Sequence, residues 1–351
     1  MKISIITMHA MHNPGSVFQA FALQKYLEIQ GNDVEIIDYR PDYFYTEGNG
    51  LKYWAKRLLY YRAYESLKHK FSSFIKDNMK LTNRFVSYCE LENQQFESDV
   101  YIVGSDQLWN SDFECGKDPA YYLKFIGQGK KVSYSTSIGK SCIDDYNRDV
   151  LVQNLKDFEA LSVRELSSST QLSELLHRKV EWVCDPVFLL APKDYMSFIS
   201  EAPVKEPYVM VYISPKSEKL DKIVDYYHKK GLKVVLLGGF TKRCYCDLHI
   251  KDAGPNEFLT YICNARVVIS SSFHATAFCH IFHKNFNTIV PERNGERIMS
   301  LLNKTGLQVK AITNDIICFE DLEKKIDWNV VDEKLNDYVD GSKKYLRGVL
   351  S

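Results

Sequence analysis

The segment 266–286 combines groups that bind anions with a group that exchanges protons. Residues 267–270 predict a buried strand, and a helix is expected to follow them. Ser271, Ser272 and His274 lie between the two elements. The first turn of a helix has unpaired N–H groups and a partial positive charge, which attract phosphate or carboxylate groups. Because imidazole titrates near neutral pH, His274 is suited to acid–base chemistry beside a bound anion.

Further turns carry polar residues directly after expected strands. They are residues 13–16 with Asn13, Gly15 and Ser16, residues 104–110 with Asp106, Gln107 and Trp109, residues 162–165 with Arg164, and residues 185–186. In open parallel sheets, ligands bind at the carboxyl ends of the strands. The sequence therefore predicts that these turns and the His274 turn line one cleft.

The elements that would position these turns alternate between strand and helix. A strand at 3–7, a helix at 17–30 and a strand at 33–39 form the first βαβ unit, and such units build parallel sheets. A second alternating series begins at residue 208, after a stretch punctuated by prolines at 192, 203 and 207. We therefore expect an α/β fold of two Rossmann-like domains that face each other across a cleft. The domains are expected at 1–190 and 205–330, with a C-terminal helix at 331–351 that joins the first.

The composition is typical of a globular protein and gives no sign of a nucleic-acid partner. The 351 residues are 45% hydrophobic and 26% charged, and 45 basic residues balance 45 acidic ones. Nine cysteines occur at no repeating spacing, which favours reduced thiols. No apolar run approaches the roughly 20 residues that span a bilayer. We expect a cytoplasmic protein. The first βα turn lacks the glycine pattern of a dinucleotide site, so no cofactor is expected, and no metal site is expected either.

Several motifs, in order along the chain, resemble those of the polysaccharide pyruvyl transferase family. NPGSVFQAFALQKYL resembles the opening N-Y-G-A-x-L-Q-x-Y-A-L of the family, and GSDQLWN matches its G-S-D-Q-x-W-N. YSTSIG, SVRE and DPVFLL resemble Y-A-x-S-x-G, S-V-R-E/D and D-P-x-x-L-L, and SSFHATAFCHIFHKNF is similar to D-S-F-H-G-T-x-F-S-x-x-F-x-K-P-F. The resemblance covers nearly the whole chain. It implies a fold like that of GT-B glycosyltransferases, phosphoenolpyruvate as the donor and a pair of sugar hydroxyls as the acceptor.

The chain departs from the family pattern near the histidine. Ser271 stands where the family has Asp, and Ser272 stands where other branches carry an arginine. An anion contact that this arginine would make must come from elsewhere. Arg293 and Arg297 flank an expected helix start and are the candidates to replace it, although a solvated helix face is an equal alternative for both.

The resemblance distributes the polar residues of the turns among three roles. His274 and Asp106 are assigned to catalysis; Arg164, Ser271, Ser272, Arg293 and Arg297 to donor binding; and Asn13, Gly15, Ser16, Gln107 and Trp109 to acceptor binding. Structural alternatives stand beside these roles. His274 and Asn13 would then cap helices, Arg164 would form an ion pair with a neighbour, Asp106 would stabilise its turn and Trp109 would lie in the core.

The expected function is the formation of a pyruvate ketal on a sugar of a surface-polysaccharide precursor. The alternatives are a GT-B glycosyltransferase that uses a nucleotide-sugar donor and a non-catalytic sugar-binding protein. Segment 51–74 is basic and aromatic, with Leu51, Trp54, Leu58 and Tyr61 on one helical face. This face is suited either to packing on its own domain or to contact with an anionic membrane at the inner surface of the cell, where a lipid-linked oligosaccharide acceptor would lie.

Overall fold

Two parallel β-sheets organise the chain in the computed structural model, which describes residues 1–44, 57–212, 215–313 and 317–351. The first sheet is five-stranded, in the order β3-β2-β1-β4-β5. Its strands are β1 (Lys2–Ile6), β2 (Asp33–Tyr39), β3 (Leu81–Phe85), β4 (Val100–Val103) and β5 (Lys130–Ser133). The second sheet is six-stranded, in the order β10-β9-β8-β11-β12-β13. Its strands are β8 (Tyr208–Tyr212), β9 (Lys233–Leu237), β10 (Leu248–Ile250), β11 (Val267–Ser270), β12 (Phe286–Ile289) and β13 (Ala311–Ile312).

The central strands are mostly apolar and buried, because helices cover both faces of each sheet. In β1, for example, Ile5 pairs with Ile36 of β2 and Ile102 of β4, and all three side chains are fully buried. The helices are α1 (Pro14–Ile29), α3 (Tyr61–Asn78), α4 (Tyr88–Glu92), α5 (Asp145–Leu155), α6 (Leu166–Leu176), α7 (Glu218–Lys229), α8 (Pro255–Asn264), α9 (Phe273–Ile281), α10 (Glu296–Thr305), α11 (Phe319–Leu322) and α12 (Trp328–Leu350). Short 3₁₀ helices are η1 (Asp42–Phe44), η2 (Glu114–Gly116), η3 (Pro119–Tyr122), η4 (Pro186–Phe188), η5 (Pro192–Phe198) and η6 (Gln308–Lys310).

Helix α1 lies between the two sheets and is buried on nearly all sides. It packs on β2 and η4 of the N-terminal part and on α8 and α9 of the C-terminal part. Its start is fixed by Asn13, whose side chain accepts a hydrogen bond from the Gly15 N–H, and by Pro14 in the first turn. The N-terminus of α1 therefore points into the junction between the two parts of the molecule.

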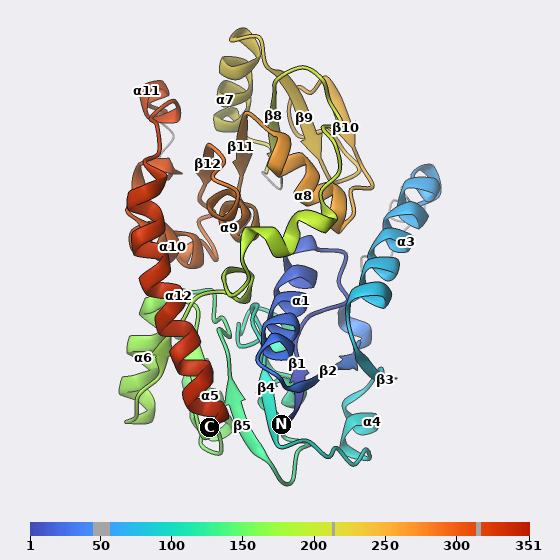
Figure 1. Ribbon diagram of the computed structural model, residues 1–351, viewed down its shortest axis with the longest axis vertical. Helices are drawn as coiled ribbons and strands as arrows, with labels where there is room; N and C mark the ends of the chain where they lie inside the picture. The colour runs from blue at the N-terminus through green and yellow to red at the C-terminus, as the bar shows by residue number, and fades with distance from the viewer. Residues whose placement is uncertain (45–56, 213–214, 314–316) are drawn as a thin grey trace.

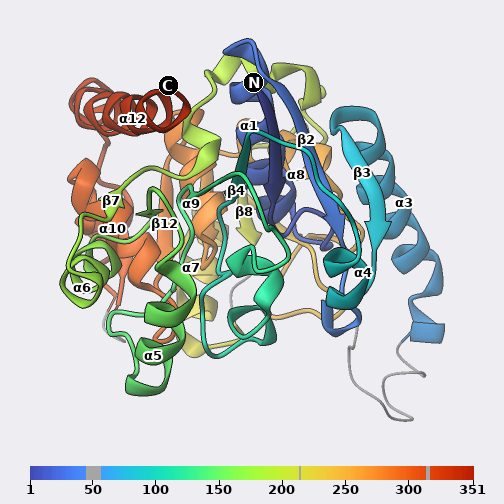
Figure 2. The same ribbon diagram turned by 90° about the horizontal axis from the view of Figure 1, so that it is seen from below.

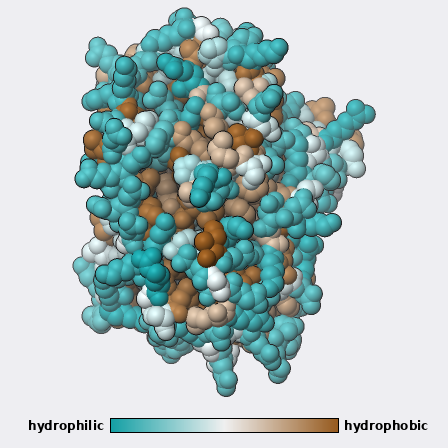
Figure 3. Space-filling model, viewed as in Figure 1, coloured by the Kyte–Doolittle hydropathy of each residue, from teal (hydrophilic) through white to brown (hydrophobic). Residues whose placement is uncertain are grey.

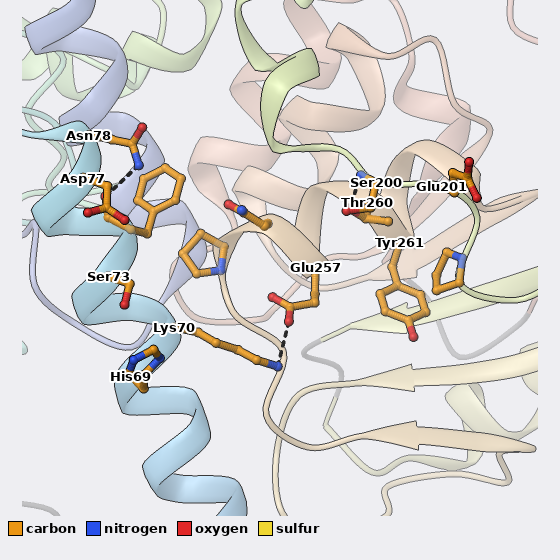
Figure 4. A pocket seen from close by; sticks show the side chains of 14 residues that line it. His69, Lys70, Ser73, Asp77, Asn78, Ser200, Glu201, Glu257, Thr260 and Tyr261 are labelled. Carbon is orange, nitrogen blue, oxygen red and sulfur yellow. Dashed lines mark hydrogen bonds and ion pairs between the residues drawn. The ribbon is translucent and has the colours of Figure 1, made fainter.

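Two long helices flank this junction on opposite sides (Figures 1 and 2). Helix α12 leaves the C-terminal part and returns along the N-terminal part, where Tyr338 donates to the Val183 carbonyl at 2.7 Å and Tyr345 to the Ser133 carbonyl at 2.8 Å. On the other side, α3 rises from the N-terminal sheet to the C-terminal part. Figure 4 shows Lys70 of α3 reaching Glu257 of α8, at 2.7 Å, across the mouth of a surface hollow of about 480 Å³.

Two short strands lead to Arg164 and to Asp185. They are β6 (Ser162–Val163) and β7 (Glu181–Trp182), which pair with each other in parallel. The second strand stops early because Asp185 accepts a hydrogen bond from the Val187 N–H and starts the 3₁₀ helix η4. The face shown in Figure 3 is mostly hydrophilic, with apolar side chains gathered near its centre. Among the described helices, none is long and apolar enough to cross a membrane.

Candidate active site

Asp106 lies in the turn after β4 and anchors one side of the candidate site. Its backbone has a φ of +80°, which is unfavourable for a residue other than glycine and is typical of functional turns. Its carboxylate accepts a hydrogen bond from the Ser16 hydroxyl at 2.6 Å and lies 3.6 Å from Arg164 Nη2 and 3.7 Å from Arg297 Nη1. Burial alone would raise the pKa of Asp106, but the charges of Arg164, His274 and Arg297 outweigh it and lower that pKa. Asp106 is therefore a carboxylate.

Asp185 is the second buried carboxylate of the site. It accepts a hydrogen bond from Arg164 Nη1 at 2.5 Å and from the Ser105 hydroxyl at 2.9 Å, and His274 Nε2 lies 3.5 Å away. Burial opposes ionisation, but the nearby His274 and Arg164 hold the pKa of Asp185 well below its ordinary value. The sequence analysis assigned no role to Asp185, although it follows an expected strand in the same way as the residues that were singled out.

His274 comes from the C-terminal part and closes the cluster. It lies in the first turn of α9, and its side chain is almost completely buried. Nε2 makes no hydrogen bond to any residue that the structure describes. The cap of α9 is Ser272, whose hydroxyl accepts a hydrogen bond from the Ala275 N–H. The alternative interpretation of His274 as the cap of its own helix is therefore wrong.

Gly15 faces His274 at the point where α1 and α9 come together. A Cβ atom on Gly15 would lie only 2.1 Å from His274 Nδ1. No side chain larger than hydrogen fits at this position without moving the imidazole. Gly15 therefore allows the N-terminus of α1, in the N-terminal part, to lie directly against His274 at the start of α9, in the C-terminal part.

Arg164 and Arg297 bring two guanidinium groups into the same cluster. Burial and the positive charge of Arg164 together lower the pKa of Arg297 to about 10. Within the described chain, the buried Nε and Nη2 of Arg164 and Nε of Arg297 have no hydrogen-bond acceptor. Buried donors without acceptors are rare in proteins. Here both guanidinium groups lie close to Asp106, and Arg164 shares Asp185 with His274. The arrangement is suited to binding an oxyanion.

Glu165, next to Arg164, completes the set of buried ionisable groups. Its side chain is fully buried and accepts a hydrogen bond from the Ser137 hydroxyl. Burial raises the pKa of Glu165 above its ordinary value, so this carboxyl group holds a proton more readily than Asp106 or Asp185. Arg164 forms an ion pair with Asp185, as its structural alternative expected of a neighbour.

The remaining predicted residues lie at different distances from this cluster. The amide of Gln107 is 3.3 Å from the Arg297 guanidinium, which places Gln107 at the site. Asn13 caps α1, which is the structural role given as its alternative. Ser271 lines a separate cavity. Arg293 is exposed, whereas Arg297 lies 3.7 Å from Asp106, so of these two arginines only Arg297 belongs to the cluster.

The predicted contact of Trp109 with a sugar is wrong. The indole is fully buried, its Nε1 donates to the Tyr121 carbonyl at 3.0 Å, and its ring is parallel to that of Tyr122. It therefore has no open face on which a sugar ring could stack. The loop 111–125 folds back over the indole, and this long-range contact has no local signal in the sequence.

The turns around Asp106 and His274 meet as the sequence predicted. Asp106, Arg164, Asp185 and His274 form one chain of contacts between the two parts of the molecule. Asn110 adds a direct link, because its Nδ2 donates to Asn294 Oδ1 at 3.2 Å. The side chains form a compact buried cluster rather than the walls of an open cleft, because opposite charges pair across the junction.

Segment 51–74 is described only from residue 57 onwards. Leu51 and Trp54, two members of the predicted helical face, lie outside the described residues. The other two, Leu58 and Tyr61, are 79% and 57% exposed. Further along α3, Phe71, Phe74 and Ile75 are buried, so this end of the segment packs on its own domain. Membrane contact by the exposed end stays a prediction.

A model of the polysaccharide pyruvyl transferase family matches residues 13–292. The chain belongs to this family. The matched range includes Asp106, Arg164, Asp185 and His274, whereas Arg297 lies beyond its end. No curated protein matches the chain. Membership supports a transferase that acts in polysaccharide biosynthesis.

Solved structures show which fold the chain adopts. The UDP-GlcNAc 2-epimerase of Methanocaldococcus jannaschii aligns with a TM-score of 0.52 at 13% sequence identity, covering 97% of this chain and 93% of that chain. The E. coli heptosyltransferase WaaC with ADP aligns with a TM-score of 0.42 at 9% identity, covering 96% and 100%. At such identities the likeness concerns the fold alone. The predicted α/β fold of the GT-B type is confirmed.

Proposed function

We propose that the protein transfers the enolpyruvyl group of phosphoenolpyruvate to two hydroxyls of one sugar and so forms a pyruvate ketal on a surface-polysaccharide precursor. Family membership supports polysaccharide pyruvyl transfer in general terms. The observation that carries the specific proposal is the set of buried guanidinium donors without acceptors on Arg164 and Arg297, in the same cluster as His274. A donor with phosphate and carboxylate groups needs such N–H donors, and its chemistry needs an acid next to them.

The reaction requires one protonation and two additions of oxygen at the same carbon. A proton added to the methylene carbon of phosphoenolpyruvate makes C2 an oxocarbenium-like electrophile. One sugar hydroxyl adds to C2, the C2–O bond to phosphate breaks, and the second hydroxyl closes the ketal. Of the two protons lost by the hydroxyls, one balances the proton gained by the methyl group and the other leaves with phosphate. The steps use acid–base groups and cations, with no change of redox state.

His274 is the proposed proton donor, and Asp185 is a positioning residue for it. The Asp185 carboxylate lies 3.5 Å from Nε2 on one side of the imidazole, and Gly15 lies against the ring at Nδ1. Arg164 binds Asp185 through Nη1, and its Nη2 lies 3.6 Å from Asp106. Neither Nε nor Nη2 makes a hydrogen bond within the described chain, so both can donate to an oxygen of the donor. Asp106 and Ser16, which are hydrogen-bonded to each other in the same cluster, supply a carboxylate and a hydroxyl that can orient the attacking sugar hydroxyl.

The experiment compares Arg297, which lies beside Asp106, with Arg293, which is close to it in sequence but exposed. We expect Arg297→Ala to weaken the binding of phosphoenolpyruvate, measured by titration calorimetry, by about tenfold or more, because a buried charged hydrogen bond is lost. Arg293→Ala is the matched control and should bind like wild type. Wild-type protein should release phosphate only when both phosphoenolpyruvate and a sugar acceptor are present. Absence of binding by the wild type, or equal effects of the two substitutions, would contradict the proposal.

A further inference from the structure

Two side chains of helix α12 bind the backbone of the segment that leads to Asp185. Beyond the end of β7, the Val183 carbonyl accepts a hydrogen bond from the Tyr338 hydroxyl at 2.7 Å, and the Cys184 N–H donates to Ser342 Oγ at 2.8 Å. Ser342 in turn donates to the Tyr338 carbonyl at 2.7 Å. All four residues are buried. The C-terminal helix therefore fixes the backbone immediately before Asp185.

Tyr338 also contacts Trp182, and Trp182 binds the backbone of Arg164. The centroids of the two aromatic rings are 4.8 Å apart, with an interplanar angle of 42°. Trp182 Nε1 donates a hydrogen bond to the Arg164 carbonyl at 3.0 Å. Tyr338 therefore supports the backbone at both Arg164 and Asp185, which are charged residues of the candidate site.

A third contact of Tyr338 involves the helix that carries Arg297. Lys304 Nζ, in the last turn of α10, lies 5.5 Å from the centroid of the Tyr338 ring and 5.7 Å from that of the Trp182 ring. A cation at this distance from an aromatic ring is attracted to it. Arg297 lies in the first turn of the same helix, and α10 packs on α12 (Figures 1 and 2). The aromatic pair of Trp182 and Tyr338 is therefore the point at which elements from both parts of the molecule meet.

The other end of α12 is attached to the end of α9, the helix that begins at His274. The Trp328 ring is stacked on that of His283, with centroids 4.8 Å apart and an interplanar angle of 12°. One turn further along α12, Asp332 Oδ1 lies 3.0 Å from His283 Nε2. Because an α-helix rises about 1.5 Å per residue, the ten residues from Trp328 to the aromatic pair span about 15 Å. Helix α12 therefore sets the distance between the end of α9 and the segment before Asp185.

We propose that Tyr338 is a positioning residue, which through α12 sets the place of Asp185 against His274. The inference rests on the proposed function and adds a residue that acts on the site through the backbone. Asp185 and His274 come from different parts of the molecule and are 3.5 Å apart, so a small shift of either segment changes their contact. A misplacement of about 1 Å at a reacting group can lower a rate about 100-fold.

The experiment removes only the hydroxyl of Tyr338 and measures phosphate release. Tyr338→Phe keeps the aromatic pair and should lower kcat about tenfold, while phosphoenolpyruvate affinity, measured by titration calorimetry, stays within about threefold of wild type. Tyr345→Phe is the matched control on the same helix. Tyr345 makes the same kind of bond, to the Ser133 carbonyl at 2.8 Å, but this carbonyl also accepts from Ser162 Oγ at 2.8 Å. The control should keep the wild-type kcat.

A second measurement asks whether Tyr338 acts through the contact of Asp185 with His274. We expect Tyr338→Phe to lower the residual kcat of His274→Gln less than about twofold, because the group that is being positioned is already lost. Changes of melting temperature alone do not produce this pattern. Equal fold effects of Tyr338→Phe in wild type and in His274→Gln would show that Tyr338 acts independently of His274 and would overturn the inference.

Hydrogen exchange separates the failure of this inference from that of the proposed function, because it requires no turnover. Tyr338→Phe should speed amide exchange both in residues 183–188 and in the first turn of α9, residues 273–276, whereas Tyr345→Phe should speed neither. If these changes occur in a protein that releases no phosphate from phosphoenolpyruvate, the proposed function fails and the positioning role stands. Faster exchange in residues 183–188 alone would make Tyr338 a local structural residue. That result, or equal kcat values in the two phenylalanine variants, would overturn the inference.

Discussion

The substitution His274→Gln tests whether His274 acts in catalysis or only contributes to the stability of the fold. If His274 protonates the donor, the loss of a general acid should lower kcat by about 10²–10⁴-fold, which corresponds to about 2.7–5.5 kcal/mol in the activation free energy. Stability should change little. Nε2 makes no hydrogen bond within the described part of the chain, and Ser272 rather than His274 caps α9. Glutamine keeps a donor near Asp185 and introduces no charge.

A second histidine on the same helix provides the control. The ring of His280 is buried and contacts the Thr276 carbonyl at 2.8 Å and the Thr305 hydroxyl at 3.2 Å. Burial lowers the pKa of His280 to about 4, so it is neutral near pH 7. His280→Gln should therefore lower the melting temperature, because buried hydrogen bonds are lost, while kcat of the folded protein stays within a few-fold of wild type.

The assay measures phosphate release, donor binding and melting temperature on both variants. His274→Gln should bind phosphoenolpyruvate within about tenfold of wild type, because Arg164 and Arg297 remain. Near-normal turnover together with a lowered melting temperature in His274→Gln would refute the reasoning. The same variant with both turnover and donor binding abolished would show that His274 holds the donor rather than protonating it.

Other substitutions test the surroundings of His274. Asp185→Asn should lower stability by about 3–5 kcal/mol in urea unfolding at pH 7, because buried cations lose their partner. The folded-state pKa of Asp185 lies below the unfolded value near 4, so its contribution is present above about pH 4 and is lost as the pH falls; the variant and wild type should therefore converge in acid. Gly15→Ala should lower kcat, with phosphoenolpyruvate binding less affected, because its Cβ would displace the imidazole. Leu58→Asp should reduce co-sedimentation with anionic vesicles, whereas Val330→Asp, at a residue that is 46% exposed on α12, should not; equal sedimentation of both would argue against membrane contact.

The sequence was sufficient for the features that depend on local signals. Alternation of apolar strands and amphipathic helices predicted the two parallel sheets, and polar turns after strands predicted that Asp106 and Arg164 would lie at one edge. Gly15 and Ser16 were found in the same way, because a glycine and a capping sequence mark the start of α1. These features follow from chain order and hydrophobic period, which one sequence contains.

Features that depend on how distant segments pack were not predictable. Arg293 and Arg297 flank the same helix start, but only the packing of α10 against the N-terminal part decides that Arg297 faces Asp106. Trp109 resembled a sugar-binding aromatic residue, and its burial depends on a loop that folds back from residues 111–125. Asp185 carried the same turn signal as its neighbours, yet its position between Arg164 and His274 required both sheets to be in place.

The charge balance of the cluster explains why it joins the two parts of the molecule. Asp106 and Asp185 offset Arg164 and Arg297, so the buried charges are matched before His274 is counted. Removing any one of them from water without its partner would be costly, which favours the arrangement in which both parts meet. A donor anion that entered the cluster would accept hydrogen bonds from the N–H groups of Arg164 and Arg297 that have no acceptor in the described chain. In the proposed function the donor binds to the same groups that join the two parts of the molecule, so we expect donor binding to depend on how these parts are positioned relative to each other.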